Sequence, residues 1–166
     1  MSALFRIVEW CGSLLRRLYW RAVYDGLRRR YEIHAGFRFN GFGIQLFGPG
    51  RIVLRNDSYI GELSTIQASL GHVVTIEEQC RISHNVRIYT ETSIADCDFI
   101  AGPVTPVTGD VHIGRGAWIG ANVYIGPSVS IGSDTVVGAN SVVTKDVPSG
   151  QIWGGVPARL IRKKNR

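Results

Sequence analysis

A six-residue repeat of apolar side chains dominates the second half of the chain. Isoleucine or valine stands at every sixth position from Ile113 to Val143, and a glycine follows each of the first five. A second series of small or β-branched residues stands four positions later. The two series are Ile113, Ile119, Ile125, Ile131, Val137 and Val143, and Ala117, Val123, Val129, Thr135, Ser141 and Val147. A short fixed period with two inward positions predicts a solenoid, whose coils bury their apolar residues against one another.

The same period occurs upstream, with two interruptions. The upstream members are Ile60, Ile66, Ile76, Ile82, Ile88, Ile94 and Ile100. Over 70–75 the six-residue spacing is interrupted by four extra residues. Over 101–112 a segment with proline and glycine replaces two repeats. Insertions leave a solenoid as loops that often carry function, so we treat residues 101–110 as a functional loop.

Length, composition and charge limit the function classes. A chain of 166 residues, 45% hydrophobic and with 20 glycines, suits one tightly turned β domain. No apolar run is long enough to span a membrane and arginines interrupt the first 30 residues, so we expect a cytoplasmic protein without a cleavable signal peptide. Residues 1–30 and 159–166 each carry a net charge of +5, and residues 31–158 carry −4. Because basic residues do not spread over the solenoid, nucleic acid is not an expected partner.

The three cysteines, Cys11, Cys80 and Cys97, lack the spacing of metal ligands. Cys80 occupies an inward position of its repeat, and cysteine is often fully buried. We therefore expect Cys80 to belong to the core.

The N-terminal segment has the pattern of an amphipathic, basic helix. Apolar residues follow the helical period over residues 4–22, and most arginines face elsewhere. Such a helix covers the open first coil of the solenoid, or it lies on an anionic membrane surface. Two tryptophans and the run Arg28–Arg30 keep the second interpretation open, and with it a location at the inner face of the membrane. The predicted domains are this helix at 1–32, a β-helix at 33–150 with a loop insertion at 101–112, and a tail at 151–166.

The end of the chain resembles a known family. Residues 106–162 read PVTGDVHIGRGAWIGANVYIGPSVSIGSDTVVGANSVVTKDVPSGQIWGGVPARLIR. This stretch is similar to the C-terminal half of the hexapeptide-repeat acyltransferases, near the galactoside, maltose and serine acetyltransferases. The resemblance implies an all-β fold, a left-handed parallel β-helix, which is an exception to the right-handed crossover rule. We expect an N-terminal α-helix and a short C-terminal helical tail in addition. The family also implies a homotrimer with active sites between neighbouring subunits.

The same resemblance implies acetyl-CoA as co-substrate. Transfer from a thioester needs a bound coenzyme, a base for the attacking hydroxyl or amine, and a donor for the developing oxyanion. The family's coenzyme positions correspond here to Trp118, Ala121, Ala139, Thr144, Lys145, Arg159 and Arg162. Small residues would admit the pantetheine arm, and the two guanidinium groups suit the phosphates.

The base departs from the galactoside and maltose pattern. The histidine that follows three repeats in that group corresponds to Ser93, and serine is no general base. His84 lies in the run Ile-Ser-His-Asn, which resembles the I-x-H-[DN] arrangement of sugar N-acyltransferases with this fold. We predict His84 as base, since a neutral imidazole suits proton abstraction. The remaining candidates, in falling order, are His112, His72 and His34. The orienting carboxylate stays open among Glu91, Asp96 and Asp98.

Tyr89, Glu91 and Asp96 are the predicted acceptor contacts, with Thr90 and the loop 103–110 beside them. A zinc enzyme like the β-helical carbonic anhydrases needs three histidines, two of them five residues apart in that family. Here the intervals are 38, 12 and 28 residues, so no metal is expected. A silent scaffold is the other alternative, favoured by Ser93.

The sequence therefore predicts an acetyl-CoA-dependent acetyltransferase. Its acceptor would be the hydroxyl or amine of a sugar, a nucleotide sugar or a lipid-linked glycan, in surface polysaccharide or glycan synthesis. A peripheral membrane contact through the N-terminal helix accompanies this prediction.

Overall fold

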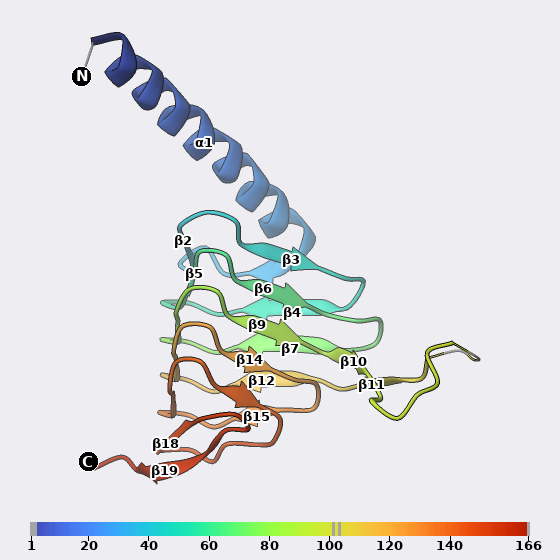
Figure 1. The fold of residues 1–166 in the computed structure, drawn as a ribbon. Helices are drawn as coiled ribbons and strands as arrows, with labels where there is room; N and C mark the ends of the chain where they lie inside the picture. Colours follow the sequence, from blue (N-terminus) through green and yellow to red (C-terminus); the bar gives the residue numbers. More distant parts are fainter. Residues whose placement is uncertain (1–2, 101, 103, 166) are drawn as a thin grey trace.

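The structure is a computed structural model that describes residues 3–100, 102 and 104–165. One helix, α1 (Ala3–Arg30), precedes a triangular stack of short strands (Figure 1). Each coil places one strand on each of three faces, and the strands of neighbouring coils pair in parallel. The predicted left-handed parallel β-helix with an N-terminal helix is confirmed.

Five coils build the stack. The first face has the order β1 (Glu32–Ile33), β4 (Arg51–Leu54), β7 (Val73–Ile76), β12 (Val111–Ile113) and β15 (Ser130–Ile131). The second face holds β2 (Arg38–Asn40), β5 (Tyr59–Gly61), β8 (Arg81–Ile82), β13 (Trp118–Ile119), β16 (Val136–Val137), β18 (Gln151–Gly154) and β19 (Arg159–Lys163). The third face holds β3 (Gln45–Phe47), β6 (Thr65–Gln67), β9 (Arg87–Tyr89), β14 (Tyr124–Ile125) and β17 (Val142–Val143).

The two predicted series form the core. Every member of both, from Ile113 to Val147, is at most 1% exposed. The buried hydroxyls have acceptors, as buried polar groups need: Thr135 Oγ1 donates to the carbonyl of Pro148 and Ser141 Oγ to that of Gly138. Cys80 is fully buried as predicted, and burial raises the pKa of its thiol to about 11.

The last turns of α1 cover the first coil, so the capping interpretation holds for this part. Tyr24 and Leu27 pack against the core, and the Tyr24 ring stacks on Phe39 at 4.4 Å between centroids. The Tyr24 hydroxyl donates to the carbonyl of Gly41 over 2.9 Å. The helix ends at Arg30, before the predicted boundary at 32, and residues 1–2 lie outside the described part. Its N-terminal turns project away from the coils (Figure 1).

An arm leaves the solenoid between the third and fourth coils. Its antiparallel strands are β10 (Glu91–Ser93) and β11 (Pro106–Thr108). Ile94 is 38% exposed and Ile100 98%, so the prediction that they continue the core series is wrong. The inward companion of Ile94 would be Asp98, and burial of a carboxylate in an apolar core is costly.

The excursion therefore runs over 91–110 instead of 101–112, since β12 already begins at Val111. Residues 101 and 103 of the predicted loop lie outside the described part.

The predicted C-terminal helical tail is wrong. Strands β18 and β19 form an antiparallel pair on the second face, and β18 extends that face from β16. Gly155, at φ 100°, and Pro157 lie in the connecting turn, where they disfavour a helix. The pair covers the edge that the last coil would otherwise expose.

Candidate functional site

Two corners of the solenoid carry the predicted site residues. The first, between the second and third faces, contains His84 and the residues in register with it, and we call it the His84 corner. The second, between the third and first faces, is where the arm leaves, and we call it the arm corner.

At the His84 corner, three predicted residues lie one above the other. Arg81 pairs with Trp118 and Trp118 with Val136, so His84, Ala121 and Ala139 occupy the same place in successive coils. Backbone bonds hold this register, because Asn122 N donates to the carbonyl of His84 over 3.1 Å and Asn140 N to that of Ala121 over 2.8 Å. Neighbouring coils are about 4.8 Å apart, so the column from His84 to Ala139 spans about 10 Å.

An asparagine ladder supports this column. Asn85 Nδ2 donates to Asn122 Oδ1 over 2.8 Å, and Asn122 Nδ2 donates to Asn140 Oδ1 over 2.9 Å. All three residues have φ between 54° and 60°, the left-handed region that asparagine tolerates better than most residues. The corner is therefore held by side chains as well as by the backbone.

The column continues into the C-terminal hairpin. Gly138 N donates to the carbonyl of Trp153, and Gly155 N to Ser141 Oγ over 3.1 Å, which places the β18–β19 turn against the last coil at this corner. Arg159 pairs with Gly154 at the start of β19 and is exposed. A line of small residues thus leads from His84 to a cationic side chain. Arg162, farther along β19, is exposed as well.

The His84 side chain is exposed, and within the described residues its ring has no hydrogen bond. Glu91 and Asp96, two of the predicted orienting carboxylates, lie in the arm, away from this corner. The carboxylate nearest in register is that of Glu62, which occupies the position of His84 one coil earlier. The backbone carbonyl of Glu62 accepts a hydrogen bond from Asn85 N.

Trp118 lies just before this corner, on the outer side of the second face, and is 52% exposed. It lines a cleft of about 850 Å³ together with Arg38, Arg81, Ser83 and Lys164. The Lys164 ammonium pairs with Asp134. Three basic residues and Asp57 thus line the cleft, with Trp118 and Tyr59 as its aromatic side chains.

The other predicted contacts lie at or beyond the arm corner. Thr144 and Lys145 follow β17 and are exposed there, so the third face separates them from Ala139. Tyr89, at the end of β9, stacks on Tyr124 at 5.9 Å between ring centroids. Glu91 pairs with Thr108 at the base of the arm, whereas Asp96 is exposed farther out. One chain does not bring these residues to the His84 corner.

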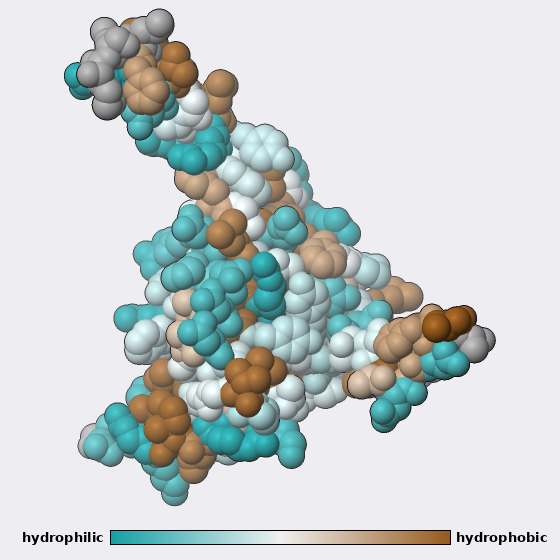
Figure 2. Space-filling model, in the orientation of Figure 1, coloured by the Kyte–Doolittle hydropathy of each residue, from teal (hydrophilic) through white to brown (hydrophobic). Residues whose placement is uncertain are grey.

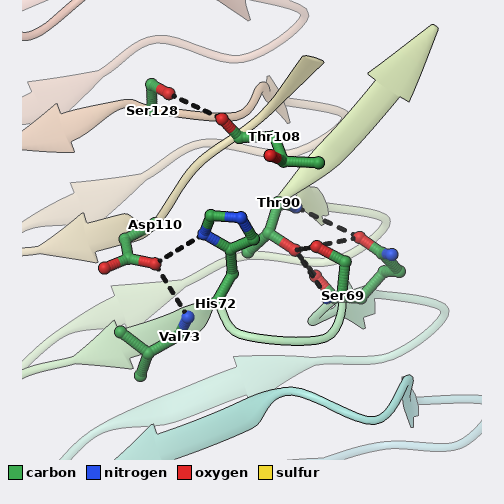
Figure 3. A network of polar contacts seen from close by, with 8 residues as sticks. Ser69, His72, Val73, Thr90, Thr108, Asp110 and Ser128 are labelled. Carbon is green, nitrogen blue, oxygen red and sulfur yellow. Dashed lines mark hydrogen bonds and ion pairs between the residues drawn. The ribbon is translucent and has the colours of Figure 1, made fainter. Parts of the chain in front are cut away.

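His72, which ranked low among the candidate bases in the sequence, pairs with an aspartate at the arm corner (Figure 3). His72 Nδ1 lies 3.0 Å from Asp110 Oδ1, which also accepts the Val73 N–H over 3.0 Å. Both contacts lower the pKa of Asp110, and the hydrogen bond from the Val73 N–H has the larger effect. A cleft of about 490 Å³ contains both residues, with Ser130 and Asp146. In the sequence, the interruption of the six-residue repeat over 70–75, directly around His72, was the signal for this feature.

The remaining histidines have structural partners. His112 Nε2 lies 3.3 Å from Glu77 Oε1, and His34 Nδ1 accepts the Gly36 N–H over 3.0 Å. Among the residues that the structure describes, no three histidine, cysteine or carboxylate side chains are grouped to hold a metal ion.

Comparison with known proteins agrees with this architecture. Residues 110–145 match the family model of the bacterial transferase hexapeptide (six repeats). A hexapeptide-repeat acetyltransferase of Vibrio cholerae O1 biovar eltor, solved with acetyl coenzyme A, is 27% identical with a TM-score of 0.71, over 88% of this chain and 79% of that one. A maltose O-acetyltransferase of Clostridium difficile 630 is 25% identical with a TM-score of 0.68, over 100% of this chain and 90% of that one.

Curated relatives include UDP-3-O-acylglucosamine N-acyltransferases. That of Methylobacterium nodulans is 28% identical over 81% of this chain and 41% of its own length. The chain thus spans about two fifths of the length of the curated relatives that it matches.

Proposed function

We propose that this protein, which has the fold and the repeats of the hexapeptide-repeat acyltransferases, transfers an acetyl group from acetyl-CoA to a hydroxyl or amine of a sugar. The observation that carries the proposal is the column of His84, Ala121 and Ala139, with Arg159 beyond it at the end of the coils. A base, a narrow track and a cation follow one line, as an extended thioester would require.

The coenzyme fits this line in chemical terms. Small side chains leave the backbone of the corner open to the pantetheine arm. Arg159, with Arg162 farther along β19, would meet the phosphates, where guanidinium groups make bidentate contacts. Trp118 offers an aromatic surface next to the column, and the solved Vibrio relative is a complex with acetyl coenzyme A.

His84 would act as the general base. As the acceptor oxygen or nitrogen attacks the thioester carbonyl, its proton passes to the imidazole, and a C–O or C–N bond forms. The C–S bond then breaks, and the imidazolium returns the proton to the leaving sulfur. The Ile-Ser-His-Asn run around His84 resembles a sugar N-acyltransferase arrangement, and N-acyltransferases of an acylated UDP-glucosamine are among the relatives.

We also propose that the site is completed by a neighbouring copy in a homotrimer. Ala139 and Thr144 stand at opposite ends of one strand of the third face, five residues apart, or about 17 Å if extended. A second copy could bring its arm corner, with Thr144, Lys145 and Tyr89, to the His84 corner of the first. Glu91 and Asp96 would then contact the acceptor.

The relatives that act on sugars and on a nucleotide sugar support the proposed acceptor class. Sugars, nucleotide sugars and lipid-linked glycans are the proposed acceptors, in surface polysaccharide or glycan synthesis. The proposed place is the cytoplasm, at the inner face of the membrane. The described residues contain no helix that could cross a bilayer.

Release of coenzyme A from acetyl-CoA, measured with a panel of sugars, nucleotide sugars and glycans, tests the function. The variants are His84→Ala and, as matched histidine controls, His72→Ala and His34→Ala. We expect acceptor-dependent release to fall by about 10² to 10⁴-fold in His84→Ala only. Loss in His72→Ala with an active His84→Ala would move the base to the arm corner. No release with any acceptor and no acetyl-CoA binding would favour a silent scaffold.

A further inference from the structure

We propose that the outer face of α1 binds the surface of an anionic membrane. The starting point is that α1 has two apolar faces, of which the solenoid uses one. The solenoid-facing side contains Trp20, Val23, Tyr24 and Leu27, the last two packed directly against the core.

A second apolar stripe has no partner among the residues that the structure describes. It consists of Ile7, Val8, Cys11, Leu14, Leu15, Leu18 and Ala22, and Tyr19 borders it beside Trp20. At 3.6 residues per turn, the stripe residues lie nearly opposite the solenoid-facing side. The large members are 40–66% exposed, and Figure 2 shows apolar surface along the projecting helix. An apolar stripe of several turns is more than scattered surface hydrophobics.

The charge of α1 indicates which kind of surface covers this apolar stripe. The helix carries seven arginines and two carboxylates, a net charge of +5. Three arginines serve the fold, since Arg28 and Arg30 donate to backbone carbonyls and Arg16 lies over the Phe42 ring. The other four have no hydrogen bond or ion pair within the described part of the chain. They are Arg6, Arg17, Arg21 and Arg29.

These free cations suit lipid phosphates. Arg17 and Arg21 lie on one flank of the stripe, where they also line a cleft with the first coil, and Trp10, 64% exposed, lies on the same flank. Insertion of the stripe into the headgroup region would leave the guanidinium groups at the phosphates and the indole at the boundary. The projection of the helix leaves this face free to meet a flat surface (Figure 1).

A second copy of the chain fits this face less well. Pairing the stripes of two helices would bring two sets of five net positive charges together, and like charges repel. An anionic bilayer removes the same apolar area from water and neutralises the arginines.

Flotation of the full-length protein with lipid vesicles tests the proposal. The vesicles are phosphatidylcholine alone or phosphatidylcholine with phosphatidylglycerol. We expect binding only to the anionic vesicles, weakened by added salt. Leu14→Gln with Leu18→Gln, which keeps good helix formers, should abolish binding.

Arginine variants measure the charge contribution. Arg17→Gln with Arg21→Gln should weaken binding to anionic vesicles by about 25-fold, or about fivefold per arginine. The matched control is Arg51→Gln with Arg55→Gln, which removes two charges from the solenoid, where both arginines pair with Glu32. This control should bind as the wild type does.

The outcomes are separable. Absence of wild-type binding to anionic vesicles would overturn the proposal, as would equal weakening by the solenoid control. So would a lipid-free oligomer that dissociates only in the leucine variant, because a second copy would then cover the stripe. Acetyl transfer to soluble acceptors should remain normal in all helix variants, so the membrane and acyltransferase proposals can fail independently.

Discussion

The fourth and fifth coils and the arm share the six-residue spacing of isoleucine, yet only the coils bury it. Ile119 and Ile131 are fully buried, whereas Ile100, in the arm, is 98% exposed. The coils also have a small or β-branched residue at the second inward position, and the arm has Asp98 in the corresponding place. A period therefore predicts a coil only where both inward positions are apolar or can be hydrogen-bonded.

The largest expected effect separates these two regions directly. Ile119→Ala leaves a cavity in the fourth coil and should reduce the free energy of unfolding by about 2–5 kcal/mol. Ile100→Ala removes the same atoms from the exposed arm and should change it by less than about 0.5 kcal/mol. Urea unfolding of both variants measures the contrast, and similar losses would mean that the arm packs as part of the core.

This contrast also explains what the sequence could predict. The strict double series over 113–147 predicted the buried positions correctly, because each repeat is one local unit of the same geometry. The arm and the C-terminal hairpin were mispredicted. Ile94 and Ile100 keep the six-residue period, but the second inward position after Ile94 is Asp98. The hairpin β18–β19 depends on pairing with the last coil, which a local pattern does not contain.

The candidate site was predicted partly from the same repeats. The resemblance predicts Ala121, Ala139 and Arg159 as coenzyme contacts. The solenoid register aligns the two alanines with His84, and Arg159 pairs with Gly154 beyond the last coil. The pair of His72 and Asp110 joins residues 38 apart in sequence across the base of the arm. The interruption of the repeat over 70–75 marks the position of His72 but does not identify Asp110 as its partner, because the contact depends on how far the insertion displaces the chain.

A moderate effect tests what holds the His84 corner. Asn122→Ala removes two side-chain hydrogen bonds and strains a residue at φ 59°. We expect a loss of about 1–3 kcal/mol in the free energy of unfolding. Asn122→Gly also removes the bonds but accepts this backbone conformation, so it should lose about 1 kcal/mol less. Wild-type stability in both variants would mean that the backbone alone holds the corner.

The smallest effect concerns the base of the arm. The pKa of Asp110 is lowered in the folded protein, so its contacts stabilise the fold above the usual carboxyl pKa. That stabilisation is lost as the pH falls through the lowered value. In Asp110→Asn this component of the acid destabilisation should be missing. Urea unfolding at neutral and acid pH measures it, and an identical pH dependence in variant and wild type would exclude the contribution.

The most direct test of the central claim is the dissociation constant of acetyl-CoA for two corner variants. Ala139→Trp fills the proposed track, and Ser133→Trp places the same ring at an exposed corner of the same coil, between the first and second faces. We predict that Ala139→Trp weakens acetyl-CoA binding by about tenfold or more, while Ser133→Trp binds as the wild type does. Unchanged binding in Ala139→Trp would contradict the assignment of the His84 corner as the acyl-transfer site.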